Sequence, residues 1–212
     1  MANRGPCLQT IDNTSASGVL PCYKEESLAG TLLRKENPWT TRFSRTAYQN
    51  KWIRVREDQV TRPDGSPGIY GVVEVPPSVG VVALNQEDCV ALIGQWRYPV
   101  GRYLLEIPRG GSAGHPDILA AAKRELAEEA GVAAASWTSL GAVEVNSGIT
   151  SDVQHLFLAQ DLSPAMARHD ADEQLDLIWS PFAEAVQMAM RGDISEVCSV
   201  AALLRVARAR GL

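Results

Sequence analysis

The pattern of hydrophobic and polar positions predicts a β-hairpin at residues 48–76. Residues 48–60 (YQNKWIRVREDQV) alternate apolar and polar side chains, which is typical of a strand. Residues 61–68 are rich in turn-forming types, and residues 68–76 (GIYGVVEVP) predict the returning strand. Because two strands alone are only marginally stable in water, we expect this hairpin to pack against another part of the protein.

Longer apolar segments later in the chain predict a buried sheet. Residues 79–85 and 89–99 are nearly continuous apolar runs, which predict strands covered on both faces. Three further strands are predicted at 136–145, 152–162 and 175–181. A Pro at the start and a Gly at the end bound a predicted helix at 181–192, and an amphipathic pattern predicts a last helix at 194–211.

Composition and pattern divide the chain into three parts. Residues 1–36 are polar and mixed, and we interpret them as a loosely structured extension. Residues 37–77 form a small N-terminal β unit, which Pro76 and Pro77 end. Residues 78–212 form the main domain.

The segment from Gly110 to Val132 predicts a glycine-containing loop followed by one helix. Pro116 and Asp117 suit the first turn of a helix, and Gly131 suits its end. Apolar residues recur on one helical face and can pack on a sheet. They are Leu119, Ala122, Leu126 and Ala130.

The same helix carries three carboxylates on a neighbouring face. Glu125, Glu128 and Glu129 are spaced so that all three project together. One interpretation is a solvated acidic surface. However, Arg124 offers a helical partner to Glu128, whereas Glu125 and Glu129 have no Lys or Arg four residues away. A hard divalent cation such as Mg²⁺ takes oxygen ligands and would neutralise such a cluster.

The composition is that of an ordinary globular protein with a net negative charge. The formal charge of −5 and the pI near 5.3 make a broad nucleic-acid-binding surface unexpected. No apolar run approaches the length of a membrane span, and the N-terminal residues lack the apolar core of a signal peptide. The four cysteines show no CxxC spacing. We therefore expect a cytoplasmic protein with reduced thiols, without nucleic-acid or membrane partners.

Three motifs together resemble a known family. Counted from Gly110, the residues Arg124, Glu125, Leu126, Glu128, Glu129, Gly131 and Val132 match the Nudix box, G-x5-E-x7-R-E-U-x-E-E-x-G-U, where U is bulky and apolar. One position departs, because Pro116 stands where the family has its first Glu. Residues 95–99 (Q-x-R-x-P) and 106–110 (E-x-P-x-G) are similar to the ADP-ribose pyrophosphatase branch.

This resemblance implies a fold and a metal site. The fold would be an α/β/α sandwich around a mixed sheet, of the Nudix type, preceded by the small β unit. Mg²⁺ or Mn²⁺ would be held mainly by Glu125 and Glu129, with Glu128 assisting. In the resembling enzymes the residue before the first Gly gives its backbone carbonyl to a metal. Here that residue is Arg109, whose side-chain identity would matter little for ligation.

The resemblance also implies a substrate-binding set. By itself Arg97 fits a surface charge, but within this motif it would grip the pyrophosphate. Glu106 would be a buried supporting carboxylate or would orient a ligand. Gly110 belongs to the same substrate-binding set, and Arg124 would brace the carboxylate face.

The resemblance also implies that the general base lies in the acidic loop at 169–174. We place it at Glu173 in preference to Asp172, although the alignment can slip by two residues, and Glu128 is a further alternative. Without a catalytic role, this loop would be solvated surface.

The resemblance implies a hydrolase of a nucleoside diphosphate linked to another group. ADP-ribose, cleaved to AMP and ribose 5-phosphate, is the expected small-molecule partner, with nucleotide sugars next. The resembling enzymes are dimers, so we expect a homodimer. The competing hypothesis is a non-catalytic Nudix-fold sensor of a nucleotide sugar, which Pro116 favours and the three intact glutamates oppose.

Overall fold

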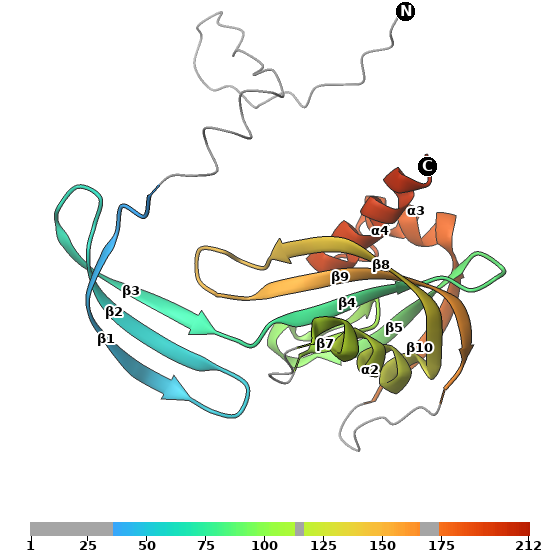
Figure 1. Cartoon of the computed structure of the whole chain (residues 1–212), viewed down its shortest axis with the longest axis horizontal. Helices are drawn as coiled ribbons and strands as arrows, with labels where there is room; N and C mark the ends of the chain where they lie inside the picture. The colour runs from blue at the N-terminus through green and yellow to red at the C-terminus, as the bar shows by residue number, and fades with distance from the viewer. Residues whose placement is uncertain (1–35, 113–116, 166–173) are drawn as a thin grey trace, which may run out of the picture. The chain divides into compact units, whose positions relative to one another are not determined.

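The computed structural model describes residues 36–112, 117–165 and 174–212 (Figure 1). Strands β1 (Thr40–Gln49), β2 (Arg54–Thr61) and β3 (Pro67–Glu74) form an antiparallel sheet in that order. The predicted turn at 61–68 and returning strand at 68–76 are confirmed to within a residue or two.

The single strand predicted at 48–60 is wrong, because the chain reverses within it. Asn50 Oδ1 accepts hydrogen bonds from the backbone N–H groups of Trp52 and Ile53, each at 2.8 Å. This Asn-centred turn separates β1 from β2. Strand β1 gave no alternating signal, because every one of its residues is exposed. The hairpin is therefore the second half of a three-stranded sheet.

The β1–β3 sheet contacts the loop that follows β8, as expected for strands that need a packing partner. The Val73 backbone N–H donates to Ile149 O at 2.9 Å, and Ser151 N–H donates to Val73 O at 3.0 Å. The Tyr70 hydroxyl adds a hydrogen bond to Gly148 O at 3.0 Å.

The main domain contains two sheets in place of one continuous sheet. The first, in the order β7-β4-β9-β8, comprises β7 (Arg109–Gly111), β4 (Ser78–Ala83), β9 (Val153–Pro164) and β8 (Val132–Glu144). It is mixed, because β4 and β9 are parallel while the other pairs are antiparallel. The second, in the order β10-β5-β6, comprises β10 (Asp176–Pro181), β5 (Cys89–Arg97) and β6 (Arg102–Glu106). A short 3-10 helix, Tyr98–Val100, connects β5 to β6.

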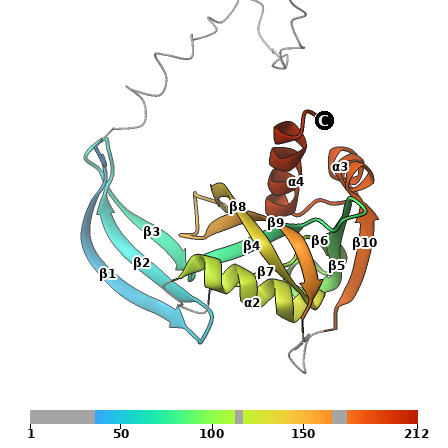
Figure 2. The same ribbon diagram turned by 45° about the vertical axis from the view of Figure 1, so that its right-hand side comes forward.

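Helices cover both faces of these sheets (Figure 2). Helix α2 (Ile118–Ala130) packs on the face to which Val79 and Val81 of β4 point. Helices α3 (Phe182–Arg191) and α4 (Val197–Ala209) pack with Val82 and Leu84 on the other face. Alternate residues of β4 are thus buried in two separate cores. The expectation of an α/β/α arrangement with strands covered on both faces is confirmed.

Helix α2 begins two residues after Pro116, which the sequence analysis placed in its first turn. Asp117 is its N-cap, and its carboxylate accepts the Ala120 backbone N–H at 3.1 Å. Gly131 ends the helix with a φ of 64°, which only Gly adopts without strain. Pro116 lies outside the described residues. Among the residues described, no helix is long and apolar enough to cross a membrane.

Candidate active site

Two of the three helix carboxylates are buried against strand β7. Glu125 is 8% exposed and Glu129 is 7% exposed. The Arg109 backbone N–H donates to Glu129 Oε2 at 2.8 Å. The space over Gly110 is filled by the Glu125 carboxyl group, which lies 2.3 Å from where a Cβ would stand. A side chain at 110 would therefore displace Glu125, which explains the glycine.

Arg124 neutralises part of this acidic face. Its guanidinium contacts Glu125 Oε1 at 2.6 Å and Glu128 Oε2 at 2.8 Å. It also donates to Gly111 O at 2.9 Å. The expectation that Glu125 lacks a basic partner is wrong, because a long Arg side chain reaches the next residue as well as the one four positions on. Arg124 thus joins the helix to β7.

The orientation of β7 bears on the expected carbonyl ligand at Arg109. At the two ends of β7, hydrogen bonds point toward β4: the Val81 N–H donates to Pro108 O, and the Ser112 N–H donates to Pro77 O. In an antiparallel strand the N–H and C=O of one residue point to the same edge. The Arg109 carbonyl therefore points to the edge where its own N–H meets Glu129. This orientation suits a ligand role beside the helix carboxylates.

These groups line a cavity of about 350 Å³. Its walls include the helix carboxylates, the β7 backbone and a guanidinium from β5. Among the described residues, no three His, Cys, Asp or Glu side chains are gathered as ligands of one ion. Mg²⁺ is commonly held by one or two carboxylates, with water and substrate phosphate completing its shell. Glu125, Glu129 and the Arg109 carbonyl are hard oxygen donors that fit such an ion.

Arg97 and Glu106 form a two-pronged ion pair at the wall of this cavity. Arg97 Nε lies 3.0 Å from Glu106 Oε1, and Nη2 lies 2.5 Å from Oε2. Glu106 is only 1% exposed, so the simple surface-charge interpretation of Arg97 does not describe its surroundings. This geometry fixes the plane of the guanidinium, which lines the cavity.

Two residues that the sequence did not single out also line this region. Trp52, in the turn between β1 and β2, borders the inner cavity and a wider one of about 820 Å³ that overlaps it. Asp152 borders the wider cavity and accepts a hydrogen bond from Ser78 Oγ at 3.2 Å. The Asn50-Lys51 pair before Trp52 was the available signal, since Asn favours turns, but the alternating pattern around it predicted a strand.

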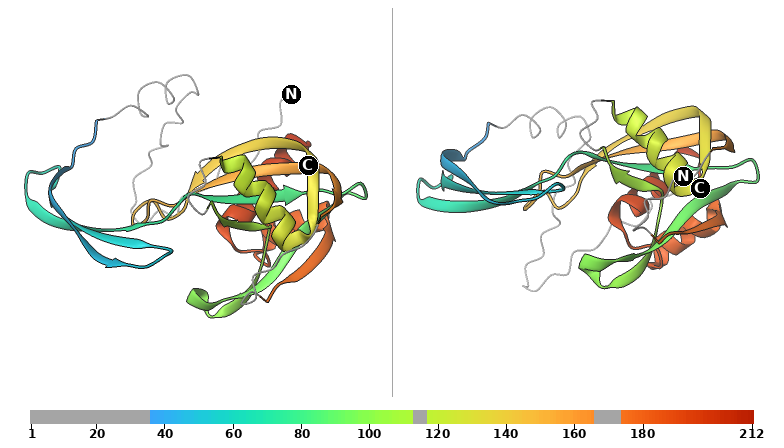
Figure 3. Two further views of the ribbon diagram at one scale, coloured as in Figure 1. Left: turned by 60° about the horizontal axis from the view of Figure 1, so that its bottom comes forward. Right: turned by 90° about the horizontal axis from the view of Figure 1, so that it is seen from below.

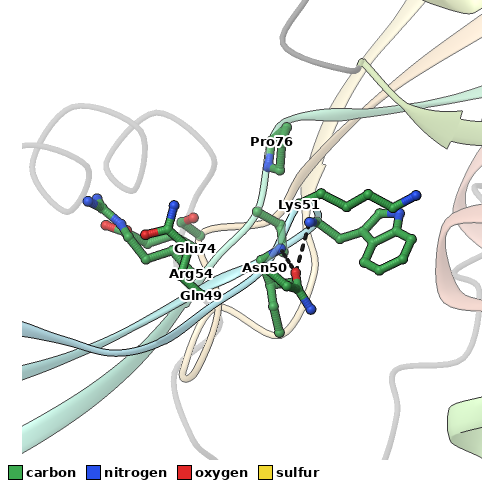
Figure 4. A pocket seen from close by; sticks show the side chains of 10 residues that line it. Gln49, Asn50, Lys51, Arg54, Glu74 and Pro76 are labelled. Atoms are coloured by element: carbon green, nitrogen blue, oxygen red, sulfur yellow. Dashed lines mark hydrogen bonds and ion pairs between the residues drawn. The ribbon is translucent and has the colours of Figure 1, made fainter.

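The turn that carries Trp52 is well defined by its own contacts. Figure 4 shows Asn50 and Lys51 at the turn, with Arg54 and Glu74 nearby on β2 and β3. Lys51 Nζ lies 4.1 Å from the centre of the Trp52 ring, and Arg54 and Glu74 form an ion pair. The indole is 65% exposed, so one face is available to a ligand.

The predicted general base, Glu173, and its alternative, Asp172, lie outside the described residues. The other predicted site residues gather around one cavity. Those that border it are Arg97, Arg109, Gly110, Arg124, Glu125, Glu128 and Glu129, and Glu106 contacts Arg97. Figure 3 shows α2 lying across the sheet that contains β7 and β4. The catalytic, binding and metal-ligand roles assigned to these site residues stay predictions.

Comparison with known proteins identifies the family. The NUDIX domain model matches residues 74–198, and the nucleoside diphosphate sugar hydrolase N-terminal domain matches residues 39–73. The chain belongs to the Nudix family. The expected class of enzyme, a Nudix pyrophosphohydrolase, is confirmed at this level, and Nudix hydrolases generally use divalent metal ions.

Relatives and a solved structure agree with this assignment. The chain is 32% identical to the ADP-ribose pyrophosphatase of Mycobacterium tuberculosis over 81% of its own length and 84% of that protein. It is 30% identical to the ADP-ribose pyrophosphatase of Bacillus subtilis, over 59% of this chain and 68% of that protein. It is also 30% identical to the methanol dehydrogenase activator of Bacillus methanolicus, over 66% of this chain and 77% of that protein. A crystal structure of an ADP compounds hydrolase superposes with a TM-score of 0.74, at 23% identity over 84% of this chain and 98% of that one, which supports the Nudix fold.

Proposed function

We propose that this Nudix protein hydrolyses ADP-ribose to AMP and ribose 5-phosphate with Mg²⁺, or with Mn²⁺ in its place. The observation that carries the proposal is that one cavity is lined by acidic, basic and aromatic side chains. Carboxylates of α2, the Arg97 guanidinium and the Trp52 indole all border the 350 Å³ cavity. These groups suit a dication, a pyrophosphate and a base, respectively. The two relatives named ADP-ribose pyrophosphatases support the choice of substrate.

The reaction requires that negative charge be neutralised and a water molecule be placed. A bound dication would neutralise the pyrophosphate and lower the pKa of a water in its shell. Arg97, held by Glu106, would grip phosphate oxygens. A carboxylate would take a proton from the attacking water. The water oxygen would form a bond to one phosphorus atom while the bond from that phosphorus to the bridging oxygen breaks, and the second phosphate leaves. We propose Glu173 for the proton transfer, which is typically worth about 10²–10⁴ in rate.

Two further groups would favour a nucleotide with a sugar. The exposed face of Trp52 would stack on the adenine ring, since aromatic side chains bind flat rings by offset stacking. Asp152 in the wider cavity is an acceptor for sugar hydroxyls. Other nucleotide sugars would satisfy the same contacts, so they are the next substrates to test.

A sensor that binds but does not hydrolyse is the second candidate. Pro116 replaces the first Glu of the box, and Asp117 beside it caps α2 through Ala120 N–H. Asp117 is therefore occupied with a structural bond. The intact Glu125, Glu128 and Glu129 favour catalysis.

The deciding experiment incubates the wild-type protein with ADP-ribose, ADP-glucose and a dinucleotide, each with Mg²⁺, Mn²⁺ or EDTA. We expect equal amounts of AMP and ribose 5-phosphate from ADP-ribose, only when a dication is present. Binding in calorimetry without turnover of any compound would establish the sensor. Neither binding nor turnover would reject both.

A further inference from the structure

Two arginines share one buried carboxylate beside the cavity. Arg97 binds Glu106 through both prongs of its guanidinium, and Arg109 Nη1 lies 3.3 Å from the same Glu106 Oε2. A single carboxylate cannot neutralise two guanidinium groups. Arg109 is therefore placed to compete with Arg97 for Glu106.

Glu196 supplies the second negative charge. Its Oε1 lies 3.8 Å from Arg109 Nη1, so the four side chains are neutral together. Burial alone would raise the pKa of Glu196, but the Arg109 charge and hydrogen bonds from Cys198 and Ser199 hold it below its ordinary value. Burial would lower the pKa of Arg109, but Glu196 and Glu106 raise it above its ordinary value.

The start of helix α4 fixes Glu196 in place. Its carboxylate accepts the backbone N–H groups of Cys198 at 3.0 Å and Ser199 at 2.7 Å. Ser199 Oγ donates to Glu196 Oε2 at 2.7 Å and accepts the Ile107 N–H at 3.0 Å. The carboxylate is thus tied to both α4 and the segment after β6. It can hold Arg109 without moving into the cavity.

We propose that Glu196 is a positioning residue that balances the charge of Arg109 beside Glu106, so that Glu106 keeps its two-pronged bond to Arg97 and orients Arg97 toward a pyrophosphate. This inference rests on the proposed function. Arg97 gains its fixed plane from a two-pronged bond. Arg109 already shares Oε2 at 3.3 Å while both prongs are in place, and without the Glu196 charge a closer approach of Arg109 would weaken the prong on that oxygen. Glu196 borders neither of the two cavities described above, so it acts through Arg109.

The test removes the charge of Glu196 and keeps the helix cap. Glu196→Gln retains an oxygen acceptor, and Glu196→Ser supplies a preferred cap without charge. The probe is α,β-methylene ADP-ribose, which cannot be hydrolysed, titrated by calorimetry with Mg²⁺ present. We expect its Kd, and the KM for ADP-ribose, to rise about tenfold, the effect of roughly 1.4 kcal/mol. The kcat should change by less than about threefold, because Glu196 acts on binding.

A double variant separates competition from structural damage. Adding Arg109→Met to Glu196→Gln removes the competing guanidinium, so the Kd should return to within about threefold of the wild-type value. The matched control is Glu184→Gln on α3, which removes an exposed acidic partner of Arg191 and should change nothing.

Three results would contradict the proposed role of Glu196. Wild-type Kd and KM in Glu196→Gln, or in Glu196→Ser if the first protein does not fold, would overturn the inference alone. So would a double variant that binds more weakly than Glu196→Gln, because its losses would then simply add. A wild-type protein that neither binds the analogue nor hydrolyses ADP-ribose would overturn both this inference and the proposed function.

Discussion

The Arg109 backbone N–H lies 2.8 Å from Glu129 Oε2 and donates a hydrogen bond to it. One residue of β7 is therefore tied at its backbone to α2 and at its side chain to Glu106 and Glu196. The same bond places the Arg109 carbonyl at the edge of β7 that the helix carboxylates face. Residue 109 thus links the expected metal donors to the expected phosphate-binding pair.

We predict that Glu129→Gln lowers kcat by more than about tenfold, because a neutral amide is a poor ligand for a hard dication. The fold should survive, since the Gln oxygen can still accept the Arg109 N–H. Steady-state rates with ADP-ribose and a thermal unfolding curve measure both effects. Glu128→Gln is the matched change on the same helix, and because Glu128 is more exposed and paired with Arg124, its effect should be smaller. Full activity in Glu129→Gln would remove this residue from the site.

Replacing the Trp52 indole should weaken nucleotide binding. We predict that Trp52→Ala raises the KM for ADP-ribose by about tenfold, since stacking on a base is worth roughly 1–3 kcal/mol. Trp52→Phe should lose less. The control is Trp96→Ala, because Trp96 is similarly exposed, at 61%, but borders neither cavity described above. Equal KM values for Trp52→Ala and wild type would show that the turn does not contact the base.

The general base is expected at Glu173. The helix carboxylates would be ionised ligands with depressed basicity, so a separate carboxylate is needed near the attacking water. We predict that Glu173→Gln lowers kcat strongly and leaves KM within a few fold, because it removes a proton transfer in the transition state. Asp172→Asn should do less. If Asp172→Asn is the crippling change, the alignment is one residue off; if neither matters, the base lies elsewhere, with Glu128 the next to test.

We predict a homodimer in solution. Strand β1 is exposed along its whole length and forms an edge of its sheet. It carries Phe43, 53% exposed, and Tyr48, 56% exposed, and such an edge is a surface suited to pairing. Light scattering at micromolar concentration should give twice the 22.9 kDa of one chain. The mass of a single chain would contradict the prediction.

The sequence predicted the elements whose signal is local. Helix α2 followed from a cap, a periodic apolar face and the terminal Gly131, and the buried strands β4 and β5 followed from continuous apolar runs. Strand β1 could not be predicted this way, because it is exposed on both faces and its polar and apolar residues show no period. The turn at Asn50 was hidden by the apolar alternation on either side of it.

The site was predictable where a motif spans few residues, and less so where it depends on distant contacts. Glu125 and Glu129 lie on one face of α2, as their spacing predicted, and this face contacts strand β7. Their partners did not follow from helical spacing, since Arg124 reaches Glu125 and the β7 backbone reaches Glu129. Glu196 meets Arg109 only because α4 begins beside the end of β6, a contact between residues far apart in the chain.

The turn at Asn50 has a consequence for how substrate preference can change. It contributes Trp52 to the cavity, yet its shape is set by hydrogen bonds within residues 50–53. The helix carboxylates, in contrast, are bonded to β7 and its arginine neighbours, and a side chain at Gly110 would displace the Glu125 carboxyl group. Exchanging this four-residue turn should therefore retune which nucleotide is accepted, independently of the cleavage machinery. Recognition of the base and cleavage of the pyrophosphate would then be altered by separate substitutions.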